Sequence, residues 1–108
     1  MSTMRTRGRR PATDPFKGLR NVGPAARADL ATLGITSLAQ LAASNPDRLY
    51  IRLQAKTATR HDPCVWDVFA AAVHQARTGE PRDWWTFTPE RKRRQACGDF
   101  PDSLPRRR

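Results

Sequence analysis

Hydrophobic residues recur every three or four positions through the middle of the chain, the spacing that places side chains on one face of an α-helix. The helices that this spacing predicts are 25–33, 38–43, 46–56, 63–77 and a short last one reaching Arg94, after a single turn at 16–20. Their inward faces carry Ala26, Leu30, Leu33, Leu38, Leu41, Leu49, Leu53, Val65, Phe69, Ala72, Val73 and Ala76. The pattern predicts no strand. We therefore expect an all-α domain, a small bundle of about five short helices.

Capping residues mark the ends of the same helices. The predicted starts are Pro24, Ser37, Asn45-Pro46, Asp62-Pro63 and Thr88-Pro89. Polar side chains of these types accept from the free N–H groups of a first helical turn, and proline is favoured there because it has no N–H to satisfy. Gly34 is placed to end the first helix in the left-handed conformation, with Ile35 packing back.

Charge divides the chain into a domain and two ends. Lys and Arg number 20 against 10 Asp and Glu, for a net charge of +10. Residues 1–15 hold a net +3 and residues 89–108 a net +4. We expect 1–15 and 95–108 to be disordered basic arms around a domain at 16–94. The excess favours a polyanionic partner, although GC-rich coding would also explain why Arg outnumbers Lys by 17 to 3.

Other composition features limit where the protein acts. No segment approaches the ~20 apolar residues of a membrane span, so we expect no membrane partner. The basic beginning lacks the apolar stretch of a secretory signal. Cys64 and Cys97 stand far apart, and we expect no disulfide between them. Together these features favour a cytoplasmic, nucleoid-associated protein.

The segment from Leu19 to Leu30 carries the clearest functional signal. It consists of a short turn, the tight sequence Asn21-Val22-Gly23-Pro24, and a helix, which resembles a helix-hairpin-helix motif. At such a turn the backbone N–H groups of the helix start are unpaired, and the helix dipole adds positive charge, so a phosphate oxygen fits. Gly23 lets the ligand come close, while Val22 should point inward as an anchor.

The resemblance extends beyond that motif. The matching segments follow in order as Asn21-Val22-Gly23-Pro24, Leu33-Gly34-Ile35, Asn45-Pro46, His61-Asp62-Pro63-Cys64 and Trp84-Trp85. Together they resemble the small bacterial helix-hairpin-helix family described as pathogenicity-locus or mitomycin-resistance proteins, and more weakly the C-terminal domain of the competence regulator TfoX. The likeness covers about 16–94. It implies a fold of the SAM and helix-hairpin-helix kind, and a role with DNA in repair, damage resistance or competence.

We assign the DNA-binding site to the turn and the helix start that follows it. Its residues are Arg20, Asn21, Val22, Gly23, Pro24, Ala25, Ala26 and Arg27. Asn21 stands where the motif has its first glycine, and we expect it to adopt the left-handed conformation that asparagine tolerates. Arg27 stands where the motif often has alanine. It either separates the two helices or directs its guanidinium at a phosphate, and we favour the phosphate.

Other chemistry-bearing residues have simpler interpretations. His61-Asp62-Pro63-Cys64, with His74 and Cys97, could ligate a metal, but adjacent ligands rarely converge on one ion. We interpret the string as a helix start with Cys64 buried, and expect no metal, no cofactor and no catalytic residue. Trp84, Trp85 and Phe87 either stack on bases or close the core, and we favour the core. We place Trp66 at its edge and His74 on the surface.

Two classes of function remain. The first is DNA binding that does not depend on base sequence, because phosphate contacts carry no base information. The alternative is a protein-protein docking module with the same helical fold and a protein partner. An enzyme such as a DNA lyase is not expected, because the only lysines are Lys17, Lys56 and Lys92 and so small a domain leaves no room for a base pocket. The oligomeric state stays open.

Overall fold

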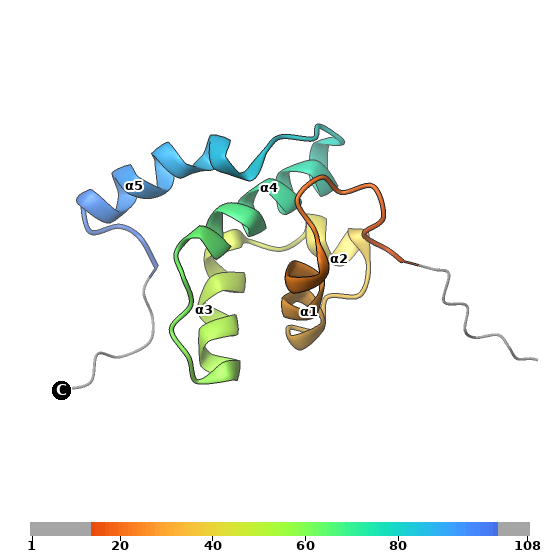
Figure 1. Ribbon diagram of the computed structural model, residues 1–108, viewed down its shortest axis with the longest axis horizontal. Helices are drawn as coiled ribbons and strands as arrows, with labels where there is room; N and C mark the ends of the chain where they lie inside the picture. The colour runs from red at the N-terminus through yellow and green to blue at the C-terminus, as the bar shows by residue number, and fades with distance from the viewer. Residues whose placement is uncertain (1–13, 102–108) are drawn as a thin grey trace, which may run out of the picture.

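This computed structural model describes residues 14–101, which contain five α-helices and one 3-10 helix (Figure 1). They are α1 (Pro24–Thr32), α2 (Leu38–Ala42), α3 (Pro46–Thr57), α4 (Cys64–Thr78), η1 (Trp84–Phe87) and α5 (Thr88–Ala96). The all-α prediction is confirmed. Within 14–101 no helix has both the length and the apolar character needed to cross a membrane.

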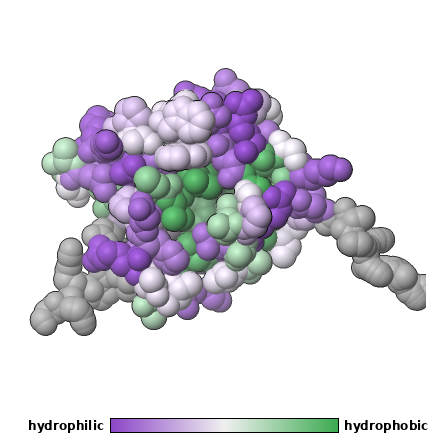
Figure 2. Space-filling model, viewed as in Figure 1, coloured by the Kyte–Doolittle hydropathy of each residue, from purple (hydrophilic) through white to green (hydrophobic). Residues whose placement is uncertain are grey.

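Helix α4 is the centre of the bundle. In Figure 1 it lies between α5 on one side and α1, α2 and α3 on the other, and α2, α3 and η1 all pack against it. Its run of buried alanines, Ala70 to Ala72, lets neighbouring helices approach closely. Phe69 of α4 and Leu53 of α3 are at most 1% exposed. Figure 2 shows hydrophobic residues gathered in the middle of this face and hydrophilic ones around them.

The helix boundaries follow the capping residues. Ser37, Asn45 and Asp62 each accept a hydrogen bond from a backbone N–H at the start of α2, α3 and α4. Gly34 has φ +77° and ends α1 in the left-handed conformation, and Ile35 after it is buried. The caps at Ser37, Asn45 and Gly34 are confirmed, because each depends only on residues within a few positions of one another. Two starts differ: α4 begins at Cys64 with Pro63 as its N-cap, and the Thr88 hydroxyl donates to Asp67 instead of capping α5.

A buried ion pair joins α5 to α4. The carboxylate of Asp67 is 0% exposed and accepts from Arg91 Nε at 2.9 Å and Nη2 at 3.1 Å. Thr88 Oγ1 donates to the same carboxylate at 2.6 Å. A carboxylate buried without partners would cost several kcal/mol. Helix α5 is therefore part of the fold, since it supplies both groups that satisfy Asp67.

A second carboxylate fixes the end of α5 to α3. Arg94 donates to both oxygens of Asp47, at 3.0 and 2.8 Å, and Trp66 Nε1 donates to Asp47 at 2.7 Å. The Phe100 ring packs on Tyr50 and Trp66, with centroids 5.5 and 5.9 Å away. Trp66 is only 4% exposed, so its expected place at the edge of the core is wrong.

The expected basic ends lie mostly outside the described residues. Residues 1–13 and 102–108 are not described, so their expected disorder stays a prediction. Residues 95–101 are described: α5 continues to Ala96, and Phe100 packs on the core. The domain therefore extends past the expected limit at Arg94.

Three further expectations differ from the structure. Leu38 is 44% exposed, because α2 has only five residues and turns Leu41 alone into the core. Trp85 is 56% exposed, although Phe87 beside it packs against the core. Asn21 is not left-handed, since Ala58 is the non-glycine residue with positive φ among those described.

We predict that Asp67→Asn lowers the free energy of unfolding by about 3–5 kcal/mol, because it leaves the Arg91 guanidinium buried without its counter-charge. Urea unfolding followed by circular dichroism measures the change. The double variant Asp67→Leu/Arg91→Met, which removes both charges together, should lose less than Asp67→Asn alone.

The matched control is Asp83→Asn, which breaks the solvent-exposed pair between Asp83 and Arg20. Exposed pairs contribute about 0–1 kcal/mol, so this variant should unfold almost as the parent does. Equal losses for Asp67→Asn and Asp83→Asn would contradict the role given to the buried pair.

Candidate nucleic-acid interface

The turn and first helical residues at 20–27, called the α1 turn below, leave backbone donors open to solvent. Gly23 is the N-cap of α1, and no side chain there accepts from the first-turn N–H groups. Pro24 has no N–H, so the donors at the helix start are those of Gly23, Ala25 and Ala26. Gly23 and Ala25 are exposed, and Ala26 is half-buried. The arrangement is an uncapped helix N-terminus, to which an anion can bind.

Gly23 contributes open space. Its φ of −92° and ψ of −167° are extended values that other residues adopt, so the backbone conformation does not require glycine. An added Cβ would have no atom within 4 Å. A side chain at this position would therefore point into open space.

Val22 anchors the α1 turn from below. Its side chain is 5% exposed and belongs to the main hydrophobic cluster, as the sequence predicted. Val22 therefore contributes to a binding surface only by holding the turn in place.

Asn21 ties the α1 turn to the segment before α5. Its Nδ2 donates to the Arg82 carbonyl at 2.6 Å, and its Oδ1 accepts from the Trp84 backbone N–H at 2.9 Å. The amide group thus bridges two positions more than 60 residues away in sequence. Its role is to fix the turn against η1.

Arg27 folds back onto its own turn. Its guanidinium donates to Asp14 at 3.0 Å from Nε and 2.5 Å from Nη2, and Nη1 donates to the Val22 carbonyl. The hydrogen bonds from Arg27 lower the pKa of Asp14. In this arrangement Arg27 braces the turn, which is neither of the two roles considered from the sequence.

Arg20 is the more exposed cation of the site. Its side chain is 51% exposed and pairs with Asp83 at 3.0 Å, while its backbone N–H donates to the Gln75 side chain at 2.9 Å. Both arginines of the α1 turn therefore have a carboxylate beside them. The positive potential that is left uncompensated comes from the backbone N–H groups at the start of α1.

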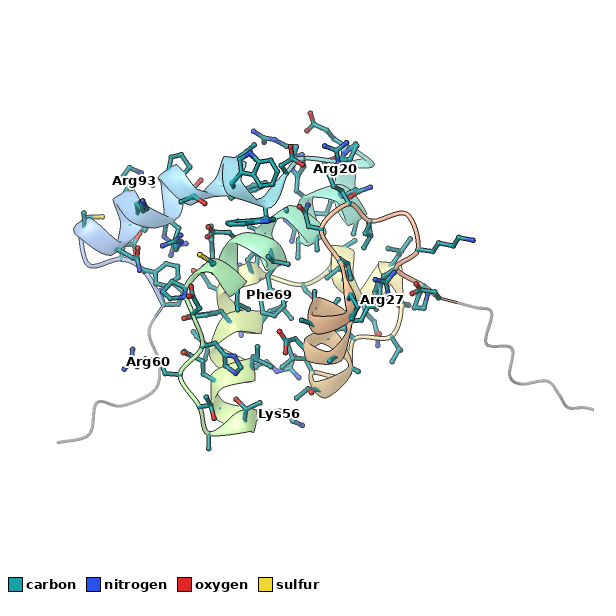
Figure 3. The ribbon with its side chains drawn as sticks, in the orientation of Figure 1. Arg20, Arg27, Lys56, Arg60, Phe69 and Arg93 are labelled. Atoms are coloured by element: carbon teal, nitrogen blue, oxygen red, sulfur yellow. The ribbon has the colours of Figure 1, made fainter. Side chains whose placement is uncertain are left out.

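The basic residues labelled in Figure 3 are spread over the molecule. Arg20 and Arg27 lie at one end, Arg93 at the other end on α5, and Lys56 and Arg60 at the far end of α3. Residues 14–101 contain 13 Lys and Arg and 9 Asp and Glu. Most of the net charge of +10 therefore belongs to the two ends that are not described.

The other candidate sites are kept apart by their own hydrogen bonds. His61 Nε2 lies 2.9 Å from Thr57 Oγ1, and His74 Nε2 lies 2.6 Å from Glu80. Cys64 is half-buried, not fully buried as expected, with Sγ 3.6 Å from Arg91 Nη2. Within the described residues, no three His, Cys, Asp or Glu side chains are grouped so that they could hold a metal ion.

One feature near the α1 turn was missed from the sequence. Trp84 and Trp85, with the start of α5, form the sides of an apolar groove, and Asn21 links the backbone of Trp84 to the turn. The Trp-Trp pair was the available signal, but the sequence analysis favoured a place for it in the core. Only the contact across 63 residues places the pair beside the turn.

Comparisons with known proteins agree with the resemblance seen in the sequence. A family model described as "Pathogenicity locus" matches residues 9–93. The chain is 44% identical over 73 residues to a protein of Streptomyces lavendulae named mitomycin resistance protein McrB, a match covering 68% of this chain and 70% of that protein. No solved structure gives a significant match.

We predict that the two thiols react at different rates in the native protein. Burial, together with the nearby Asp62 carboxylate, raises the pKa of Cys64, so this thiol stays protonated, whereas Cys97 is exposed. A thiol reagent at mildly alkaline pH should therefore modify Cys97 first, as mass spectrometry of the digested protein would measure.

In urea the two rates should converge. Modification of Cys64 as fast as Cys97 in the folded protein would contradict the prediction. Stoichiometric zinc that is lost in Cys64→Ala would contradict the interpretation of this residue as a simple helix-start position.

Proposed function

The chain belongs to the pathogenicity locus family, and on that basis we propose that it binds DNA through the backbone of the α1 turn, without dependence on base sequence. The name of its relative suggests mitomycin resistance as the setting. A protein of this kind would act at the nucleoid.

The observation that carries the proposal is the open helix start at Gly23. No side chain caps α1, no atom lies where a Cβ of Gly23 would stand, and the N–H groups of Ala25 and Ala26 follow directly. A phosphate oxygen placed there would accept from backbone donors and meet the positive end of the helix dipole. Such contacts do not read base edges, so unrelated sequences should bind alike.

The net positive charge of the chain favours association with DNA but does not determine where on the protein the DNA binds. The ends outside the described residues hold seven arginines and one acidic residue. Cations that contact phosphates release bound counterions, so affinity should fall steeply as salt rises. We propose that these ends add nonspecific attraction while the α1 turn makes the defined contact.

We propose binding and no catalysis. Cys64 has a raised pKa and His61 is hydrogen bonded to Thr57, so the pair lacks the arrangement of an activated nucleophile and its base.

Protein docking is the second candidate. The exposed side chains of Leu38 and Trp85 favour it, since they could pack on an apolar partner. Docking of that kind should depend weakly on salt.

The test of the proposal is Gly23→Val. The extended backbone and the open space around the Cβ position let the variant fold, so the added side chain obstructs only a ligand that approaches the turn. Loss of one or two charge-assisted hydrogen bonds of about 1.5–3 kcal/mol each should weaken duplex binding tenfold or more at ~0.15 M salt. Fluorescence anisotropy with labelled duplexes of two unrelated sequences measures this.

Ala55→Val is the steric control, because Ala55 is exposed on α3, away from the α1 turn. It should bind DNA as the parent does. If folded Gly23→Val also binds as tightly as the parent, the α1 turn is not the phosphate site and docking becomes the first candidate.

Asp83→Asn tests the charge at the same place in the opposite direction. It removes a carboxylate beside the α1 turn and releases the Arg20 guanidinium, so binding should tighten by about two- to fivefold. Arg48→Gln removes an exposed charge on α3 and should weaken binding only slightly.

A further inference from the structure

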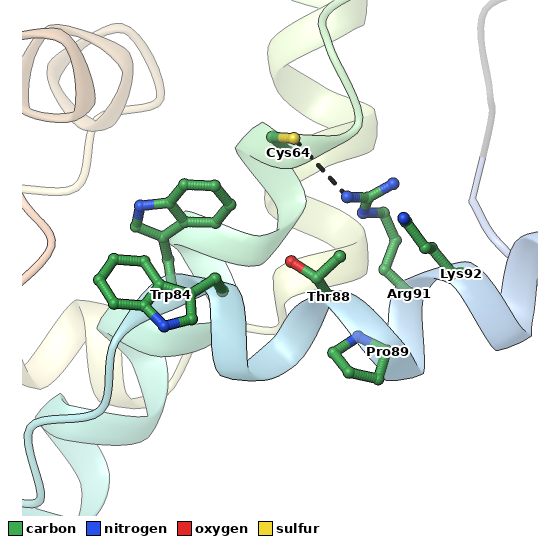
Figure 4. A pocket seen from close by; sticks show the side chains of 7 residues that line it. Cys64, Trp84, Thr88, Pro89, Arg91 and Lys92 are labelled. Atoms are coloured by element: carbon green, nitrogen blue, oxygen red, sulfur yellow. Dashed lines mark hydrogen bonds between the residues drawn. The ribbon is translucent and has the colours of Figure 1, made fainter.

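An apolar groove of about 730 Å³ lies between α4, η1 and α5 (Figure 4). Trp84 and Trp85 of η1, Cys64 of α4, and Pro89 and Lys92 of α5 are among the residues that line it. The groove is open to solvent, and most of its lining is apolar. Neither the packing of the core nor the geometry of the α1 turn accounts for a groove at this place.

The two tryptophans form a fixed aromatic wall. Their rings lie 5.7 Å apart, edge to face, and Trp85 keeps 56% of its surface exposed. The wall is held in place through Asn21, which bonds to the Trp84 N–H and the Arg82 carbonyl. An exposed indole on a braced segment presents a flat face on which another aromatic ring can stack.

The charge of the groove suits an anionic partner. No carboxylate is among its lining residues, while Asp62 lies beside Cys64 and Glu90 is exposed between Pro89 and Arg91. Asp67 already neutralises Arg91, whereas Lys92 is exposed on the rim and Arg93 is exposed after it. Residues 102–108 hold three arginines and one aspartate, so like charges disfavour this part of the chain as the occupant.

A nucleotide combines a flat aromatic base with an anionic phosphate, so it matches both the aromatic wall and the exposed cations beside it. Asn21 bonds the α1 turn directly to the segment that carries the wall, so the turn and the wall are neighbours in the fold. We propose that the groove takes an unpaired base of the DNA strand whose phosphates the α1 turn binds. The inference rests on the proposed function and makes it specific: the preferred substrate is DNA with unpaired bases, such as a duplex with a single-stranded overhang.

The test compares Trp85→Ala with the parent on two DNA probes, a blunt duplex and the same duplex with an unpaired thymidine overhang. Stacking on an aromatic side chain tolerates any base, so removing the indole should weaken overhang binding about fivefold or more. Blunt-duplex binding should change less than twofold. Trp85→Phe keeps an aromatic face and should retain most of the overhang preference.

Leu38→Ala is the matched control, because Leu38 is the other large hydrophobic residue exposed in 14–101 and lies on α2. It should leave both affinities unchanged. Circular dichroism of each variant confirms folding, which the exposure of Trp85 and Leu38 makes the expected result.

The outcomes separate the two proposals. If Gly23→Val weakens both probes and Trp85→Ala weakens neither, or weakens both equally, the groove does not take a base and the proposed function stands. If the parent binds neither probe, both proposals fail and the groove is left to a protein partner. If Trp85→Ala weakens overhang binding and leaves blunt-duplex binding unchanged, the inference is supported.

Discussion

The carboxylate of Asp67 lies fully buried in the central helix, and the position of η1 and α5 depends on it. A buried charge needs a partner of opposite sign and good geometry: among the described residues Arg91 of α5 supplies the charge, and Thr88 adds a hydroxyl donor. Helix α5 therefore has to cross α4. Because η1 leads directly into α5, the same pair also determines where the two exposed tryptophans lie.

Arginine in this chain serves two purposes that composition alone does not separate. Arg91 and Arg94 are paired with Asp67 and Asp47 inside the fold, and Arg77 donates to the carbonyls of Ala42 and Ser44 at the end of α2. These side chains hold helices together, and their charge is largely engaged. These arginines are therefore set apart from the exposed basic residues, such as Arg48, Lys92 and Arg93, and from the basic ends.

Features set by neighbouring residues could be read from the sequence, and features set by distant ones could not. The caps at Ser37 and Asn45, the left-handed Gly34 and the inward Val22 each follow from a short stretch of chain. The burial of Trp66 depends on Asp47, 19 residues earlier, and the bracing role of Arg27 depends on Asp14. For the same reason the sequence did not reveal the hydrogen bond between Asn21 and Trp84, which places the tryptophan pair beside the candidate site.

The central claim is that backbone N–H groups at the start of α1 bind phosphate whatever the base sequence. Nuclear magnetic resonance of the ¹⁵N-labelled full chain, titrated with duplex DNA, observes those groups directly. We predict that the amide signals of Gly23, Ala25 and Ala26 shift most within the folded domain, and by the same pattern for two unrelated duplexes. Unchanged signals at these three residues, or a pattern that differs between the two sequences, would contradict it.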